Sequence, residues 1–348
     1  KERKEQVAEA YREYGGFKLE ALALKDTDLI AIKYLIRLAE LGGRVERTRD
    51  TPACAKIGPD DAWRLRGWNR KFSTPSLVIS YPWFDKDHPD RHGHTLRRML
   101  PVLRAVLAEA QEHGGEHATV AVMWDVMSLV QGPDRTPEQQ ERFERALGSI
   151  NEWYMHPYSI VLAVTTPIPA GKGYTNTRAY MKRGWCYIEL RMSSLVKYYM
   201  CLWDLSLHKE GKPISFDDCC MRLNTSRLPF MSPDRVAREL TEGVASGALA
   251  FTAEADCELV SKIYRRAYVK ALETFQEISR GAIFYTKLGW GSEAVPVLVE
   301  ALEYAQEHCT MKKRQYLNFS RNKFTEADKA AIRAAIPENS TKFRITYI

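Results

Sequence analysis

The sequence predicts an α/β protein in which an open parallel sheet lies between helical N- and C-terminal regions. Between residues 74 and 207, patterns of buried strands alternate with patterns of amphipathic helices, which is typical of a parallel sheet covered by helices. On either side of this part, apolar residues recur mainly at helical spacing. We therefore expect an N-terminal helical segment and linker (1–73), a central α/β domain (74–207) and a mainly helical C-terminal region (208–348).

Four apolar runs in the central domain predict strands, and they read SLVISYPWF, HATVAVMWDVMSL, SIVLAVTTP and YYMCLWDLSL. Helices are expected between them, over HGHTLRRMLPVLRAVLAEAQEHGG, TPEQQERFERALGSINEWYMHP and RGWCYIELRMSSLV. The second of these begins with Thr136 as a cap and Pro137 at the first helical position. Four strands at this spacing, joined by helices, indicate a flavodoxin-like open sheet.

The N-terminal region contains a short alternating run from Leu19 to Leu24 and an amphipathic helix that the pair Gly42 and Gly43 stops. The apolar positions of that helix are Leu29, Ile32, Leu35, Ile36 and Leu38. The polar stretch 44–73 is expected to be a linker that lies over the next domain. The charged start of the chain lacks an initiator Met and a signal-peptide pattern, so we expect it to begin inside a longer protein.

The C-terminal region is predicted to contain helices over SPDRVARELTEGVASG and CELVSKIYRRAYVKALETFQEI, followed by helix, strand, helix and strand. The last part, YLNFSRNKFTEADKAAIRAAI, resembles one leucine-rich repeat, because Leu317 and Phe319 alternate before Asn322 and a helix follows. A solenoid needs about three stacked units. The N-terminal stretch LEALALKDTDLIAIKYLIRLAEL has a weaker version of the same shape, and we interpret the two stretches as local strand–helix units that complete one core.

Composition excludes several classes of protein. No run of about 18 apolar residues occurs, so no transmembrane segment is expected. The net charge of +7 is spread over mixed charges, which favours anionic partners such as nucleotides but no specific nucleic acid. Seven scattered cysteines without a CxxC pair indicate free thiols, a cytoplasmic location and no structural zinc. The histidines in DKDHPDRHGH lack the spacing of a metal site, so no metal is expected.

Three sequence motifs in the central domain resemble those of a known family: SYPWFD and MWDVMSL at the ends of two strands, and RGWCYIEL on a helix. In this order they resemble Toll/interleukin-1 receptor (TIR) domains, over about 130 of the 348 residues. Ser80 and Tyr81 match the Ser-aromatic pair that ends the first strand. Trp185, Cys186 and Glu189 match the Trp-Cys-x-x-Glu helix, which is the most specific of the three motifs.

The resemblance implies a catalytic role for Glu189 in cleaving the nicotinamide–ribose bond of NAD. NAD would be the substrate, no cofactor would be needed, and self-association would switch the activity on. The loops after the strands, at Tyr81 to Asp85, Asp125 to Gln131 and Thr165 to Tyr174, should face one crevice. A carboxylate there can stabilise an oxocarbenium-like ribose. The expected nucleotide contacts are Tyr81, Trp83, Asp125, Ser128, Trp185 and Cys186, with Trp124 and Tyr174 as further stacking faces and Lys172, Arg178 and Arg183 near the pyrophosphate.

Structural alternatives stay open for each of these residues. Glu189 also fits a solvated helix position paired with Lys182 or Arg183, and Trp185 also fits a core anchor. Cys186 fits a small buried hydrophobe, although some plant TIR domains use this cysteine in making cyclic nucleotides. Asp125 fits a loop cap equally well. The functional alternative is a catalytically silent TIR-like module that binds protein partners, or a structural subunit of a larger assembly.

Overall fold

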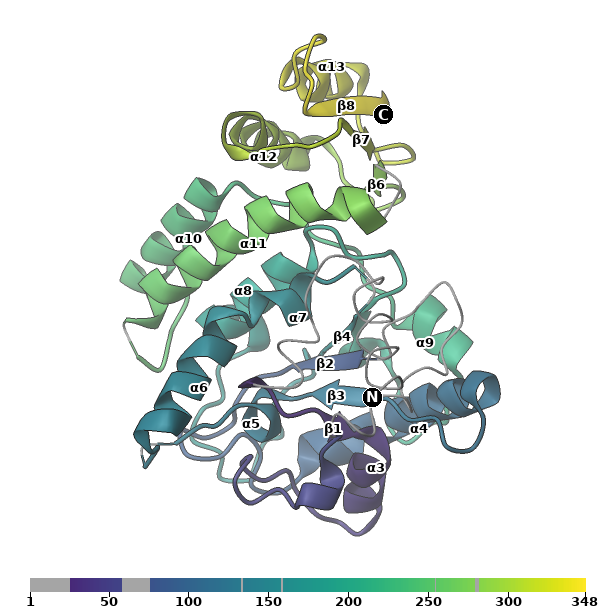
Figure 1. The fold of residues 1–348 in the computed structure, drawn as a ribbon, viewed down its shortest axis with the longest axis vertical. Helices are drawn as coiled ribbons and strands as arrows, with labels where there is room; N and C mark the ends of the chain where they lie inside the picture. The colour runs from purple at the N-terminus through teal and green to yellow at the C-terminus, as the bar shows by residue number, and fades with distance from the viewer. Residues whose placement is uncertain (1–25, 58–75, 133, 158, 254, 279–281) are drawn as a thin grey trace, which may run out of the picture.

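A computed structural model describes residues 26–57, 76–132, 134–157, 159–253, 255–278 and 282–348 (Figure 1). The alternating run Leu19 to Leu24 and the linker part 58–73 therefore lie outside the described residues. Within these ranges, no helix has both the length and the apolar content that crossing a membrane requires. All seven cysteines are described and none forms a disulfide, so the prediction of free thiols is confirmed.

The central sheet contains five strands in the order β1-β3-β2-β4-β5. Four of them are parallel to one another: β2 (Ser76–Ser80), β3 (Ala121–Met123), β4 (Ile160–Ala163) and β5 (Leu202–Asp204). They are the four predicted strands, each shorter than its apolar run. The fifth, β1 (Ile30–Ala31), pairs antiparallel with β3. The α/β class and the mostly parallel sheet are thus confirmed.

Helices cover both faces of this sheet (Figure 1). Side chains alternate along a strand, so Leu77 and Ile79 of β2 face one core and Val78 faces the other. The first face is covered by α3 (Ile32–Glu40), α4 (His94–Gly114) and α9 (Phe216–Arg222). The second is covered by α6 (Pro137–Gly148), α7 (Asn151–Met155) and α8 (Gly184–Ser193).

The second predicted helix is in fact two helices, and the second strand is followed by the short helix α5 (Asp125–Ser128). Thr136 caps α6 as predicted, in a capping box with Gln139. The break comes after Gly148, where Ser149 Oγ donates to the carbonyl oxygen of Arg145 at 2.8 Å. Glycine and a back-bonding serine both weaken a helix, which explains why the helical pattern does not continue.

The N-terminal segment becomes part of the central fold. Helix α3 ends at Glu40, before Gly42 adopts a left-handed conformation with φ of 72°. The chain then crosses the end of β3, where Thr48 N–H donates to Val126 O at 3.0 Å and Thr48 Oγ1 to Leu129 O at 2.7 Å. The 3-10 turn η2 (Ala53–Ala55) follows. Part of the stretch that was expected to be a linker is thus bonded to the loop after β3 through Thr48.

The C-terminal region packs on the second face of the central domain. The paired helices α10 (Pro233–Ala245) and α11 (Asp256–Ile278) come first, and α11 contacts α7 and α8. A second sheet follows in the order β6-β7-β8. Its elements are β6 (Ala282–Phe284), α12 (Val295–His308), β7 (Gln315–Asn318), α13 (Glu326–Ala334) and β8 (Phe343–Tyr347). The predicted helix, strand, helix and strand are present, whereas β6 and α9 were not predicted.

Three parallel strands in chain order, with helices between them, give the end of the chain a repeating architecture. Asn322 holds successive turns together, because its Nδ2 donates to Tyr285 O at 2.7 Å and to Phe319 O at 2.8 Å. Its Oδ1 accepts from Leu288 N–H at 2.9 Å. Hence the residue that suggested the repeat in the sequence satisfies backbone groups on two neighbouring turns.

Candidate functional site

The carboxyl group of Glu189 lies at the end of β2. Gly184 begins helix α8 and lets the Phe251 ring pack against the start of the helix, because a Cβ at this position would meet that ring at 2.1 Å. Ser80, the last residue of β2, donates from Oγ to Glu189 Oε2 at 2.5 Å. The same Oγ lies 2.5 Å from Tyr180 Oη, on the 3-10 turn η4 (Tyr180–Lys182). Ser80 therefore links the carboxyl group of Glu189 to the hydroxyl group of Tyr180.

Glu189 is 8% exposed, and its pKa rises from the usual 4.5 to about 8. Burial is the main cause, because it disfavours the charged form, and the negative charge of Asp125 acts in the same direction. Hydrogen bonds from Ser80 and Tyr154 oppose the rise. At neutral pH the carboxyl group is mostly protonated. The interpretation of Glu189 as a solvated helix residue is therefore wrong.

Arg183, one of the partners considered for Glu189, is itself buried and turns to backbone oxygens. It donates from Nε to Arg178 O at 2.8 Å, from Nη2 to Asn176 O at 2.9 Å, and from Nη1 to Trp83 O. These bonds fix the loop before α8 against the loop after β2. The side chain is buried and three of its N–H groups are used in these bonds, so Arg183 is not open to a pyrophosphate in this structure.

Asp125 gathers side chains from two strand ends. Tyr81 Oη donates to its Oδ1 at 2.8 Å, and Trp83 Nε1 to its Oδ2 at 3.3 Å. The N–H of Val126 also donates to Oδ1, at 2.6 Å, so the carboxylate caps the start of α5 as well. Burial raises the pKa of Asp125 although these hydrogen bonds lower it. Both interpretations of Asp125, as a cap and as a member of the strand-end cluster, thus describe its contacts.

The other expected contacts are not brought together with this cluster as free groups. Ser128 is fully buried, and its Oγ accepts from Trp124 N–H at 3.0 Å. Cys186 is buried, its Sγ donates to Tyr81 O at 3.4 Å, and burial raises the pKa of the thiol well above its usual value. Trp185 turns to the C-terminal region, where its Nε1 donates to Asp256 at 2.9 Å. The alternatives of a core anchor and a buried hydrophobe fit these contacts.

The loops after β2 and β4 are tied to each other. Tyr174 Oη donates to Asp90 Oδ1 at 2.7 Å, and Thr175 N–H donates to Asp85 Oδ1 at 2.8 Å. Asp85 also pairs with Arg91 at 2.5 Å, and the Arg91 hydrogen bond is the main reason that the pKa of Asp85 falls to about 2. Among the described residues, no group of His, Cys, Asp or Glu is arranged to hold a metal ion.

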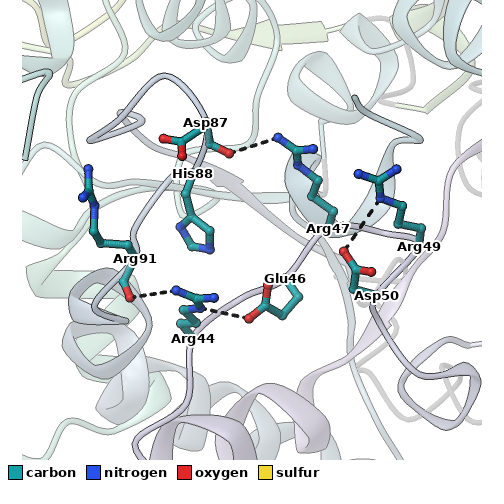
Figure 2. A pocket seen from close by; sticks show the side chains of 8 residues that line it. All are labelled: Arg44, Glu46, Arg47, Arg49, Asp50, Asp87, His88 and Arg91. Carbon is teal, nitrogen blue, oxygen red and sulfur yellow. Dashed lines mark hydrogen bonds and ion pairs between the residues drawn. The ribbon is translucent and has the colours of Figure 1, made fainter. Parts of the chain in front are cut away.

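A pocket of about 400 Å³ opens beside these loops (Figure 2). It is lined by residues of the segment 44–50 and of the loop after β2, and Glu189 is not among them. The lining residues are Arg44, Glu46, Arg47, Arg49, Asp50, Asp87, His88 and Arg91. Sequence reasoning missed this pocket because it treated 44–73 as a linker. The closely spaced arginines of RVERTRD were the available signal.

Comparisons of the chain with protein-family models, curated proteins and solved structures found no match. The functional proposal therefore depends on the site geometry and on the motif resemblance.

Proposed function

We propose that this chain is a TIR-like NAD glycohydrolase with Glu189 as its catalytic carboxyl group. The observation that supports this best is a buried carboxyl group with a pKa of about 8 at the carboxyl end of β2. Strongly perturbed carboxyl groups are concentrated in functional sites. The strand order β3-β2-β4-β5 is compatible with a flavodoxin-like sheet, in which ligands bind at the switch point between β2 and β4.

In the proposed reaction, the bond between nicotinamide and ribose C1 breaks, and its electron pair goes to the nicotinamide nitrogen. The ribose becomes oxocarbenium-like, and water attacks it to give ADP-ribose and a proton. An ionised Glu189 would stabilise the positive charge. Since its pKa is about 8 in this structure, activity should rise as the pH increases toward 8. The positive charge on the nicotinamide ring of bound NAD would favour the ionised form and lower that value.

In this arrangement the carboxyl group is bonded to Ser80 and Tyr154, and Tyr180 bonds to Ser80 beside it. A substrate would reach it after η4, which carries Tyr180, moves away from β2. We propose self-association as the trigger of this movement, which would make the activity depend on protein concentration.

The burial of Glu189 also favours the second candidate, a catalytically silent TIR-like module that binds protein partners. In that case the carboxyl group, held by Ser80 at 2.5 Å, would serve only to join α8 to β2. A buried, protonated carboxyl group whose hydrogen bonds are made inside the protein can have a purely structural role, without any substrate.

Nicotinamide release from NAD distinguishes the glycohydrolase from the silent interaction module. The wild-type chain should release nicotinamide, more per molecule at higher protein concentration, and Glu189→Gln should reduce the release at least 100-fold. Glu141→Gln is the matched control, because Glu141 is 73% exposed on α6. If the wild-type chain releases no nicotinamide at any concentration between pH 6 and 9, the glycohydrolase is refuted and the silent interaction module is favoured.

A further inference from the structure

We propose that Arg47 and Arg49 bind the phosphate groups of a nucleotide, which rests on the proposed function in taking NAD as that nucleotide. The two arginines come from the segment before the central domain, outside the part that resembles TIR domains. They lie on one side of the pocket in Figure 2, and Arg44, His88 and Arg91 lie on the other. The site would thus add a phosphate subsite to the strand-end cluster.

The backbone places these arginines beside the loop after β3. Thr48 stands between them and is anchored by its bonds to Val126 O and Leu129 O. The point that a Cβ would occupy at Gly132 lies 3.4 Å from Arg47 Nη1 and 3.9 Å from Arg49 Nη2. Both guanidinium groups therefore converge on one point.

The same loop leads back to the strand-end cluster. Gln131, the neighbour of Gly132, donates from Nε2 to Asp125 Oδ2 at 3.4 Å. Asp125 in turn accepts from Tyr81 and Trp83. A nucleotide whose ribose lies near Tyr81 would extend toward Gly132 along this path.

The charges in the pocket leave Arg47 available. Arg44 pairs with Glu46 at 2.9 Å, and Asp85 neutralises Arg91. Arg47 donates from Nη2 to the backbone oxygen of Asp87 at 3.0 Å, and no described carboxylate pairs with it. A guanidinium group with unused N–H donors binds phosphate through two parallel hydrogen bonds.

Arg49 contributes a second positive charge, since its nearest carboxylate, Asp50, is 3.9 Å away and 57% exposed. The acidic groups of the pocket, Glu46, Asp50 and Asp87, oppose an anion and limit its affinity. Burial and the charge of Arg44 lower the pKa of His88, which disfavours its charged form. The guanidinium pair is thus the part of the pocket suited to phosphate.

Binding is tested in the Glu189→Gln background, so that no substrate is consumed. Inorganic pyrophosphate and ADP-ribose are titrated by calorimetry at low and at high salt. Arg47→Gln and Arg49→Gln should each weaken both ligands at least tenfold, and high salt should weaken them as well. Arg222→Gln is the matched control, because Arg222 is 75% exposed on α9. Circular dichroism and the melting temperature verify the fold of each variant.

The outcomes separate this proposal from the proposed function. Equal affinity in the parent, Arg47→Gln and Arg49→Gln overturns the subsite, as does the absence of binding. Binding of pyrophosphate without ADP-ribose overturns its assignment to a nucleotide. Binding of ADP-ribose that needs both arginines, in a chain whose wild type releases no nicotinamide, supports the subsite and refutes the glycohydrolase. Nicotinamide release that is unchanged in Arg47→Gln supports the glycohydrolase and refutes the subsite.

Discussion

Replacing Glu189 with glutamine removes a buried acid while keeping the shape of the side chain. In the folded protein the pKa of Glu189 is about 8, against a usual value of 4.5. Between these values the folded chain keeps a proton that the unfolded chain releases. The free energy of unfolding of the wild type should therefore fall as the pH rises from 4.5 to 8, by roughly 3 to 4 kcal/mol between pH 5 and pH 8. The glutamine variant lacks this contribution.

Thermal unfolding, followed by circular dichroism at pH 5, 6, 7 and 8, measures the difference between the two proteins. A chain of 348 residues that unfolds as one unit has an unfolding entropy of roughly 0.7 kcal/mol/K. The melting temperature of Glu189→Gln, relative to wild type, should therefore rise by about 5 °C from pH 5 to pH 8. Asp125→Asn serves as a second reference, because Asp125 also raises the pKa of Glu189. A difference that stays constant with pH refutes the buried, protonated state of Glu189.

Two further substitutions test contacts away from the site. Lys197 is buried and donates from Nζ to His156 O at 2.7 Å and to Ser159 O at 2.8 Å; Lys197→Met should lower the free energy of unfolding by about 2 to 4 kcal/mol, measured from the urea midpoint. An unchanged midpoint would contradict this role. Asn322→Ala removes three side-chain hydrogen bonds to the backbone and should speed amide exchange in β6 and β7, with a loss of about 2 to 4 kcal/mol. Exchange unchanged in both strands would argue against the asparagine as the link between turns.

The sequence was sufficient for the elements with a strong local pattern. The four central strands are continuous apolar runs, and α6 carries its own capping box. Strand β6 has only three residues and α9 only seven, so neither repeats a pattern long enough to recognise. Strand β1 has only two residues, Ile30 and Ala31, and it forms because they pair with the free edge of β3. A pairing over such a distance in the chain leaves no local signal.

The sequence places several candidate residues at the ends of strands, but it does not indicate how far they are buried. Tyr81 and Asp125 meet because parallel strands end at the same edge of a sheet. The burial of Glu189 was not predictable, because its partner Ser80 is in turn bonded to Tyr180, which comes from a loop whose path has no sequence period. The arginine pocket was missed for the same kind of reason. It forms only where the segment 44–50 crosses the loop after β2.

The contact between the central domain and the C-terminal region has a consequence for how such a chain can change over generations. One apolar core runs from Val78 of β2 through α7, α8 and α11 to Phe343 of β8. Tyr187 of α8 donates to Glu239 at 2.5 Å, and Tyr285 donates to Leu195 O at 2.8 Å. A gene rearrangement that moved residues 74–207 alone would leave an apolar face uncovered. The two parts are therefore expected to be inherited together. Substitutions on one side of this contact should be accompanied by compensating substitutions on the other side.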